Sequence, residues 1–156
     1  MKTAEDIIKD NKRQMIRIFG NRSVFEAVRL MVKHQIGALV VKEGNSSVGI
    51  FSERDLLRHA ADSDFNIKTA RVSDCMSTPL PTTSHDTPVI KLKEMFLGLY
   101  IRHIVIEKEG RQIGLLSVGD VLRATLLEQD KRMKELNTMV SWEYYENWGW
   151  DRKKRK

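Results

Sequence analysis

The chain is poor in cysteine, since Cys75 is the only one among its 156 residues. One cysteine cannot form an internal disulfide, which excludes a disulfide-rich secreted scaffold and favours a reducing cytoplasm. Long apolar runs are also missing, because none approaches the roughly 18 residues that a membrane span needs. The first residues, MKTAEDIIKD, carry acids where a secretion signal would be apolar. We therefore expect a cytoplasmic protein without a targeting segment.

Excess positive charge is scarce outside the end of the chain. The formal net charge is +6, but the last six residues, DRKKRK, hold five basic residues and one acidic residue. Residues 1–150 thus carry a net charge of only +2. A basic tail can contact phosphates or an anionic membrane surface, whereas a solvated terminus needs no partner. We expect neither a nucleic acid nor a membrane as the main partner.

Catalytic motifs are also missing. The four histidines, His34, His59, His85 and His103, show no metal-ligand spacing. The sequence has no GxxxxGK loop for phosphoryl transfer and no recognisable Ser-His-Asp arrangement. We therefore expect a protein that is not an enzyme, with no catalytic residue, no metal site and no obligatory cofactor.

What the chain does contain is an internal repeat. The segment GIFSERDLLR, residues 49–58, returns 65 positions later as GLLSVGDVLR, with five of ten residues kept. The same shift aligns residues 24–58 with residues 89–123 without a gap and with eight identities. A shorter echo, KTA, occurs at residues 2–4 and 68–70. A fixed period that preserves the apolar pattern indicates a duplicated structural unit.

Each unit reads as strand, helix, strand, strand, helix, which predicts an α+β fold. The first unit has apolar or β-branched strands at 14–19, 36–41 and 48–51, and helices at 23–34 and after Ser52. The second has a proline-rich, irregular edge strand at 79–84, a helix near 89–99, strands at 101–106 and 113–116, and a helix after Ser117. Two such units packed by a pseudo-two-fold axis can bury a shared core. We divide the chain into repeats 1–66 and 67–128 and an extension, 129–156.

Both copies carry a serine followed three residues later by an aspartate, Ser52 and Asp55 in the first and Ser117 and Asp120 in the second. This spacing is typical of a capping box at a helix start, where the serine accepts an N–H and the acid reaches back. The two oxygens of such an aspartate can also accept from the vicinal hydroxyls of a ribose. The two roles are compatible, because a rigid cap also holds the carboxylate in place.

The doubled motif, the segment VSDCMSTPLPTTSHDTPV (residues 72–89) and the strand IRHIVI (residues 101–106) together resemble a tandem pair of CBS domains, the Bateman module. The resemblance covers roughly residues 1–127. It implies a small three-stranded sheet with helices in each repeat, and two symmetry-related clefts between the repeats. Proteins of this family bind adenosine-containing ligands such as AMP, ADP, ATP, S-adenosylmethionine or NAD.

The resemblance also implies residue roles. In the family the motif aspartate binds ribose, the motif serine helps to hold ribose or phosphate, and the segment leading into the other repeat contributes to the base pocket. Carried over to this chain, one cleft would use Ser52, Asp55, Thr78, Pro79 and Leu80, and the other would use Ser117, Asp120, Met15 and Ile16.

The two copies differ in their basic residues. The second has Arg102 and His103 where the first has Gly37 and Ala38, while Arg54 stands opposite Gly119. Basic residues at this place point toward phosphate in the family, so we expect the Asp120 cleft to bind phosphate better, with Arg102 and His103 as a positive clamp. Alternatively, Arg102 is a solvated strand residue and His103 a half-buried one.

The resemblance implies a regulatory module that senses an adenine nucleotide and passes a conformational change to an unknown effector protein. A homodimer of two such pairs is expected. Two alternatives remain open: binding of a nucleic acid or another polyanion through the basic tail, and a purely structural dimerisation role that needs no ligand.

The extension after residue 128 combines helical spacing with aromatic side chains. Met133, Leu136, Met139 and Val140 predict that the last helix extends or restarts there. The segment WEYYENWGW then holds all three tryptophans. Because exposed aromatic area is costly in water, we expect this segment to dock on the module, across a dimer interface. Alternatively, the segment anchors the protein at the surface of a membrane, or it covers a cleft as a plug until a ligand arrives.

Overall fold

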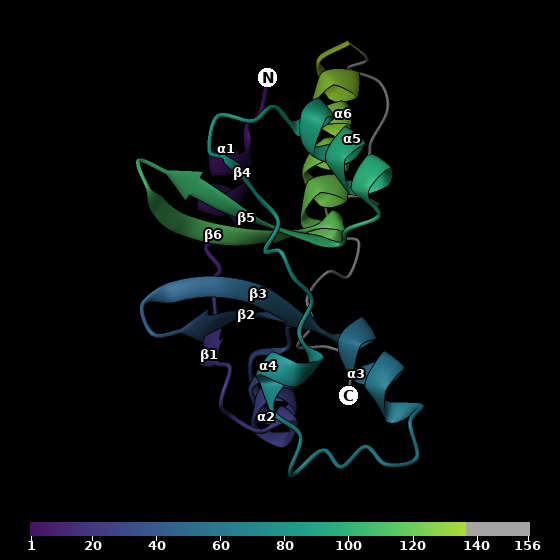
Figure 1. Ribbon diagram of the computed structural model, residues 1–156. Helices are drawn as coiled ribbons and strands as arrows, with labels where there is room; N and C mark the ends of the chain where they lie inside the picture. Colours follow the sequence, from purple (N-terminus) through teal and green to yellow (C-terminus); the bar gives the residue numbers. More distant parts are fainter. Residues whose placement is uncertain (137–156) are drawn as a thin grey trace.

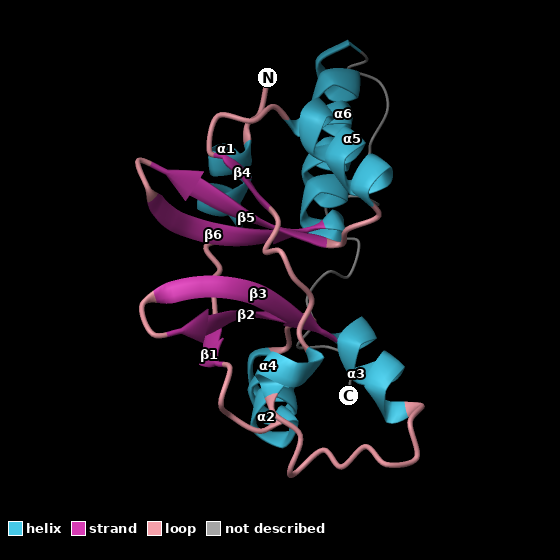
Figure 2. Ribbon diagram, in the orientation of Figure 1, coloured by secondary structure: helices cyan, strands magenta, loops and turns pink. Residues whose placement is uncertain are grey.

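The computed structural model describes residues 1–136. It consists of two three-stranded sheets that face each other at the centre, with helices packed on their outer sides (Figures 1 and 2). The α+β fold and the two strand-helix-strand-strand-helix repeats are confirmed. The predictions for the aromatic segment and the basic tail fall outside the described residues. None of the helices within residues 1–136 combines the length and apolar character needed to cross a bilayer.

The two sheets have the same topology. In each, a short first strand pairs in parallel with the second, and the second pairs antiparallel with the third. The ladders even share an irregularity, which follows Val41 in the first sheet and Ile106 in the second. The first sheet contains β1 (Arg17–Phe19), β2 (Ala38–Glu43) and β3 (Ser46–Ser52), and the second contains β4 (Thr82–Ser84), β5 (His103–Lys108) and β6 (Arg111–Ser117).

The predicted strands exist, with shifted ends. Of the strand expected at residues 14–19, three residues pair with β2, because the preceding ones turn toward the space between the sheets. The central strands begin two residues later than expected, since Gly37 and Arg102 use their carbonyls to accept the first helical N–H of the next helix. The proline-rich strand of the second repeat is short, as expected, and lies at a sheet edge.

Four helices follow the predicted pattern, namely α2 (Val24–His34), α3 (Glu53–Ala60), α5 (Val89–Leu99) and α6 (Val118–Leu136). Ser23 and Glu26 form a capping box that starts α2, and Gln35 ends it in the left-handed conformation. Tyr100 ends α5 in the same conformation. Helix α6 runs without a break to Leu136, so the predicted continuation past residue 128 is confirmed as far as the description reaches.

Two further helices lie near the start of the two repeats, and each packs on the sheet of the other repeat. Helix α1 (Ala4–Asn11) belongs to the core of the second sheet, whereas the short α4 (Val72–Cys75) belongs to the core of the first. The KTA echo marks the approach to each of them in the sequence. Each core therefore includes one helix from the other repeat. The boundary between residues 66 and 67 describes the repeats in the sequence and not the two cores.

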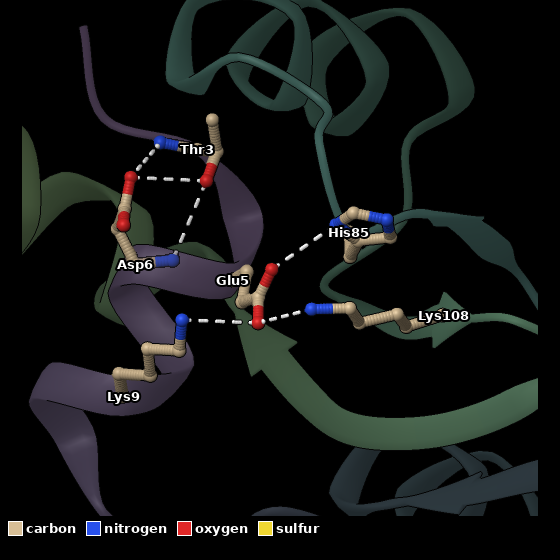
Figure 3. A network of polar contacts seen from close by, with 6 residues as sticks. All are labelled: Thr3, Glu5, Asp6, Lys9, His85 and Lys108. Atoms are coloured by element: carbon tan, nitrogen blue, oxygen red, sulfur yellow. Dashed lines mark hydrogen bonds and ion pairs between the residues drawn. The ribbon is translucent and has the colours of Figure 1, made fainter.

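Helix α1 is fastened to the second half by the polar network in Figure 3. Its Glu5 carboxylate lies 2.8 Å from Nζ of Lys108, 3.0 Å from Nζ of Lys9 and 3.1 Å from Nδ1 of His85. Hydrogen bonds from Lys108 and then Lys9 lower the pKa of Glu5 to about 2. Backbone N–H groups of Ala4 and Glu5 add bonds to the carbonyls of Thr87 and His85. Helix α1 is thus tied to β4 and β5.

The two halves meet around a pseudo-two-fold axis. The Ser47 hydroxyl donates a hydrogen bond of 2.8 Å to Oε1 of Gln112. These residues are exactly one 65-residue period apart, so each is the counterpart of the other. A contact between equivalent positions is what a two-fold relation requires of residues near its axis.

Candidate functional site

A cavity of about 970 Å³ lies between the two halves. It is lined by the starts of α3 and α6, by strand residues of both sheets, and by the segments that lead into β1 and β4. Of the twelve residues proposed from the sequence, the cavity brings together all except Leu80, namely Met15, Ile16, Ser52, Arg54, Asp55, Thr78, Pro79, Arg102, His103, Ser117 and Asp120. Residues of both motifs therefore line the same cavity.

The carboxylate of Asp55 is buried and fully engaged. Its Oδ2 accepts the backbone N–H of Ser52 at 2.8 Å and the Ser52 hydroxyl at 3.0 Å. Its Oδ1 accepts the Ser77 hydroxyl at 2.6 Å, and the residue is only 2% exposed. The capping box that the sequence predicted at Ser52 and Asp55 is thus present, and the Ser77 hydroxyl bonds to the other carboxylate oxygen. A ligand would have to break an existing bond to reach this aspartate.

The carboxylate of Asp120 is held by the same kind of capping box but is more exposed. Its Oδ2 accepts the N–H and the hydroxyl of Ser117, both at 2.8 Å, and the Ser117 hydroxyl accepts the Asp120 N–H at 3.2 Å. Its Oδ1 lies 3.1 Å from Nη1 of Arg13, whose side chain is 48% exposed, while that of Asp120 is 11% exposed. Asp120 is therefore the more accessible of the two motif aspartates.

The first backbone N–H of α3 and that of α6 already donate hydrogen bonds. That of Glu53 reaches the Gly37 carbonyl at 3.1 Å, and that of Val118 reaches the Arg102 carbonyl at 3.0 Å. A helix start offers its unpaired N–H groups to anions, and here one of those groups is used by the neighbouring strand. The starts of α3 and α6 thus have one fewer free N–H group each to offer to an anion.

The charged side chains around the cavity are mainly arginines. Arg54 and Arg102 are exposed and line it, and Arg58 lies 3.9 Å from Oδ1 of Asp55. Burial lowers the pKa of His103, which outweighs the opposing effect of Asp120 and leaves the ring neutral at pH 7. The positive charge of the predicted Arg102–His103 clamp therefore comes from Arg102, and His103 offers a neutral donor and acceptor.

The motif glycine has a packing role. A Cβ atom on Gly49 would lie 2.7 Å from the Ser77 carbonyl oxygen, and one on Gly114 would lie 2.7 Å from the Ile8 side chain. Because both glycines lack a side chain, the leading helix of each repeat (α1 or α4), or the segment directly after it, can lie directly on the sheet that contains the glycine. At both glycines the close approach is thus made by the protein's own chain.

Two residues of the site escaped the sequence argument. Arg13 and Ser77 each follow directly on the residue that ends a leading helix, and each reaches Oδ1 of a motif aspartate. A signal existed, because both stand just before segments already proposed for the base pocket. It was hidden because the leading helices themselves were not predicted.

Other chemistry finds no support in the described part of the chain. Residues 1–136 contain no group of three or more histidine, cysteine or acidic side chains placed to hold a metal ion. Cys75 is buried, and burial raises the pKa of its thiol, so the reactive thiolate is disfavoured there.

Comparison with known proteins supports the resemblance seen in the sequence. The mitochondrial CBS domain-containing protein CBSX3 of Arabidopsis thaliana is 34% identical over 127 residues, which are 78% of this chain and 62% of that protein. The chain thus spans less than two thirds of that relative. Inosine-5′-monophosphate dehydrogenase of Methanocaldococcus jannaschii is 27% identical over 142 residues, which are 90% of this chain but 27% of the enzyme.

A solved structure shows the same fold. The crystal structure of the CBS-domain containing protein ATU1752 from Agrobacterium tumefaciens matches with a TM-score of 0.75 and 30% identity, over 80% of this chain and 99% of that one. The family model for the CBS domain matches the chain twice, at residues 4–62 and 72–127. With its two matching repeats packed around a shared cavity, the chain belongs to the CBS-domain family and is a tandem CBS pair.

Proposed function

We propose that this CBS pair is a regulatory module that binds an adenosine-containing ribonucleotide and transmits the bound state to a partner protein. The observation that carries the proposal is the cavity of about 970 Å³, which joins two motif aspartates, apolar leader residues and several arginines. Its volume suits a nucleotide, because small-molecule sites typically enclose about 300–1,000 Å³. AMP, ADP and ATP are the first candidates, and S-adenosylmethionine and NAD share the adenosine.

The two halves of the cavity are not equivalent, and we assign the ribose to Asp120. Both oxygens of Asp55 are engaged in a buried position, so exchange with a ligand would cost existing hydrogen bonds. Asp120 is more exposed, and its Oδ1 partner Arg13 is itself half-exposed. Arg102 supplies the charge for a 5′ phosphate, and Met15 and Ile16 supply apolar contact for the purine. We expect one nucleotide per chain.

The test is a thermal-shift and calorimetric titration with the five candidate ligands. A nucleotide at 100 times its Kd stabilises the folded state by about 2.7 kcal/mol, which raises Tm by several degrees. Asp120→Ala should abolish this shift, whereas Asp55→Ala should keep most of it. If none of the five compounds raises the Tm of the wild-type protein, the sensor proposal fails.

A matched control separates ligand binding from helix capping. Asp6 closes the same kind of capping box with Thr3 at the start of α1, and it is not part of the cavity lining. Asp6→Ala and Asp120→Ala should therefore both lower the Tm of the ligand-free protein by removing a cap worth about 1 kcal/mol. Only Asp120→Ala should also remove the nucleotide shift. An equal loss in both variants would reduce the motif to a cap.

We further propose that two chains pair through their helical faces. Three pairs of exposed apolar residues are separated by the 65-residue period: Phe25 and Ile90, Val32 and Leu97, and Leu57 and Leu122. Each half therefore presents the same exposed positions on its helices. A pseudo-symmetric apolar surface of this kind fits a second copy of the chain better than an unrelated partner.

We place the module in the cytoplasm on the basis of its cysteine. Cys75 is the only one in the chain, it is buried, and its thiol has a raised pKa. A protein that neither uses nor exposes a thiol suits a reducing compartment. The relative named mitochondrial makes organelle fractionation the experiment that distinguishes the two locations.

A further inference from the structure

The Asp120 oxygen that faces the cavity already has a partner from the opposite end of the chain. Oδ2 of Asp120 is committed to Ser117, so Oδ1 is the acceptor left for a ligand. Nη1 of Arg13 donates to this Oδ1 at 3.1 Å. Arg13 follows directly on Lys12, the residue that ends α1. The acceptor proposed for ribose is thus covered by a cation when no ligand is bound.

In the other half, the residue directly after the end of the helix is a permanent partner of the motif aspartate. Ser77 follows directly on Met76, the residue that ends α4, and its hydroxyl donates to Oδ1 of Asp55 at 2.6 Å. This partner is neutral, short and attached to a buried carboxylate. Arg13 instead has a long side chain, is about half exposed, and makes one bond to Oδ1. The residue directly after the end of the helix therefore provides a fixed bond in one half and an exchangeable one in the other.

The ion pair between Arg13 and Asp120 is weak enough for a ligand to replace it. Ion pairs with a solvent-exposed partner contribute little net free energy, and salt screens them further. Two ribose hydroxyls can replace the guanidinium as donors to Oδ1, so the carboxylate keeps its hydrogen bonds. The released guanidinium remains attached beside the cavity that Arg102 also lines, where it adds positive charge.

We propose that Arg13 is a latch on the Asp120 site and sets its preference for charged ligands. In the empty module the guanidinium covers Oδ1, and a ribose must displace it. Arg13 therefore weakens the binding of a neutral nucleoside, while the displaced cation compensates by attracting a 5′ phosphate. This inference rests on the proposed function, because it requires a ribonucleotide at Asp120.

Displacement of Arg13 can also transmit the effect of ligand binding to the rest of the molecule. Arg13 lies in the segment between α1 and β1, and α1 is fixed to the second half through Glu5. At the other end of this segment, the Ile16 carbonyl accepts the Val40 N–H of the first sheet at 3.2 Å. Displacement of Arg13 thus acts on a link whose two ends belong to different halves of the molecule.

The experiment compares adenosine with AMP by calorimetry on the wild-type protein and on Arg13→Gln. Removal of the latch should strengthen adenosine binding by about two- to fivefold, the range expected from an exposed ion pair. The preference for AMP over adenosine should fall. Raising ionic strength from about 0.01 M to about 1 M shortens the screening length from about 30 Å to about 3 Å, so wild-type affinity for adenosine should rise while that of Arg13→Gln stays flat.

Two further variants serve as controls. Lys12→Gln removes the same charge one residue away, at a side chain that forms no ion pair within residues 1–136, so adenosine binding should not change. Arg13→Lys keeps the charge and should restore the salt dependence. Thermal melts show whether each variant is folded.

The outcomes separate the latch from the nucleotide site itself. If the wild-type protein binds adenosine and Arg13→Gln binds it equally or more weakly, the latch is wrong while the proposed function stands. If wild-type and Arg13→Gln proteins bind neither adenosine nor any of the five candidate ligands, the proposed function fails and the latch fails with it.

Discussion

Asp55 and Asp120 each use one carboxylate oxygen to accept the N–H and the hydroxyl of the serine three residues earlier. At the scale of single residues, capping and ligand binding are thus divided between the two oxygens of one side chain. The second oxygen decides what the residue can do. At the buried Asp55 it accepts the Ser77 hydroxyl, and at Asp120 it accepts a hydrogen bond from the half-exposed Arg13.

The motif glycine makes a prediction at this scale. A methyl group on Gly49 would meet the Ser77 carbonyl oxygen at 2.7 Å, a backbone atom that cannot rotate away. Gly49→Ala should therefore lower the free energy of unfolding by about 1–3 kcal/mol, the usual cost of overpacking. Urea unfolding monitored by circular dichroism measures it.

Gly98 provides the matched control with the opposite sign. It lies in helix α5, and a Cβ atom there would have nothing within 4 Å. Gly98→Ala should stabilise the protein by up to about 1 kcal/mol, because alanine has the higher helix propensity. An unchanged stability of Gly49→Ala would show that α4 can move away from the sheet without cost.

The individual residues also show where sequence reasoning succeeds and where it stops. A 65-residue period found Ser52, Asp55, Ser117 and Asp120, because duplicated motifs stand out against their surroundings. Arg13 could not be found in this way, because its partner Asp120 is 107 positions away and the period pairs Arg13 with Thr78, which differs from it in charge and size. Leu80 was included because the family resemblance assigns its segment to the base pocket, and it lies outside the cavity lining.

At the scale of elements, the exchange of α1 and α4 is the main feature that the sequence did not reveal. The helix pattern of α1 is short, and its apolar residues, Ala4 and Ile7, contact a core formed by residues far along the chain. Periodicity identifies an amphipathic helix but not the sheet on which it packs. The network around Glu5 supplies that information in the structure (Figure 3).

Protonation of Glu5 should therefore loosen α1. The pKa of Glu5 falls from 4.5 to about 2 on folding, so its contribution to stability is complete above pH 4.5 and is lost as the pH falls through 2. Glu5→Gln should lower Tm at pH 7, and the difference from the wild-type protein should shrink between pH 4.5 and pH 2. Thermal melts across this range measure the effect.

Glu94 is the control for this prediction. It pairs with Lys91 at 3.1 Å on α5, where both side chains are exposed. Glu94→Gln should leave Tm nearly unchanged at every pH, because exposed pairs contribute little. A constant difference between Glu5→Gln and the wild-type protein down to pH 2 would contradict the role given to the carboxylate.

At the scale of the whole molecule, the 65-residue period relates contacts between the two halves and also residues exposed on the surface. Inside, Ser47 and Gln112 meet at the pseudo-two-fold axis. Outside, the exposed positions of α2 and α3 recur on α5 and α6. A chain that is nearly symmetric in itself can pair with a copy so that equivalent helices meet, which covers both exposed faces at once.

This pairing gives the prediction for the assembled protein. In light scattering after gel filtration, the wild-type chain should have twice its mass of 18.1 kDa. Val32→Lys with Leu97→Lys should give single chains that keep their fold, because both positions are exposed in one chain. Glu109→Lys, at the turn between β5 and β6, should remain paired. A wild-type protein that runs as one chain at high concentration would contradict the pairing.

The exchanged helices also fix the order in which the protein can mature on the ribosome. Ala4 and Ile7 pack among Val89, Leu92 and Val121, which are translated long after them. At about 5–20 residues per second, α1 must wait on the order of ten seconds for its binding surface to emerge. The first sheet completes its core earlier, once Val72 and Cys75 have left the exit tunnel. Helix α1 thus reaches its final packing later than the core of the first sheet.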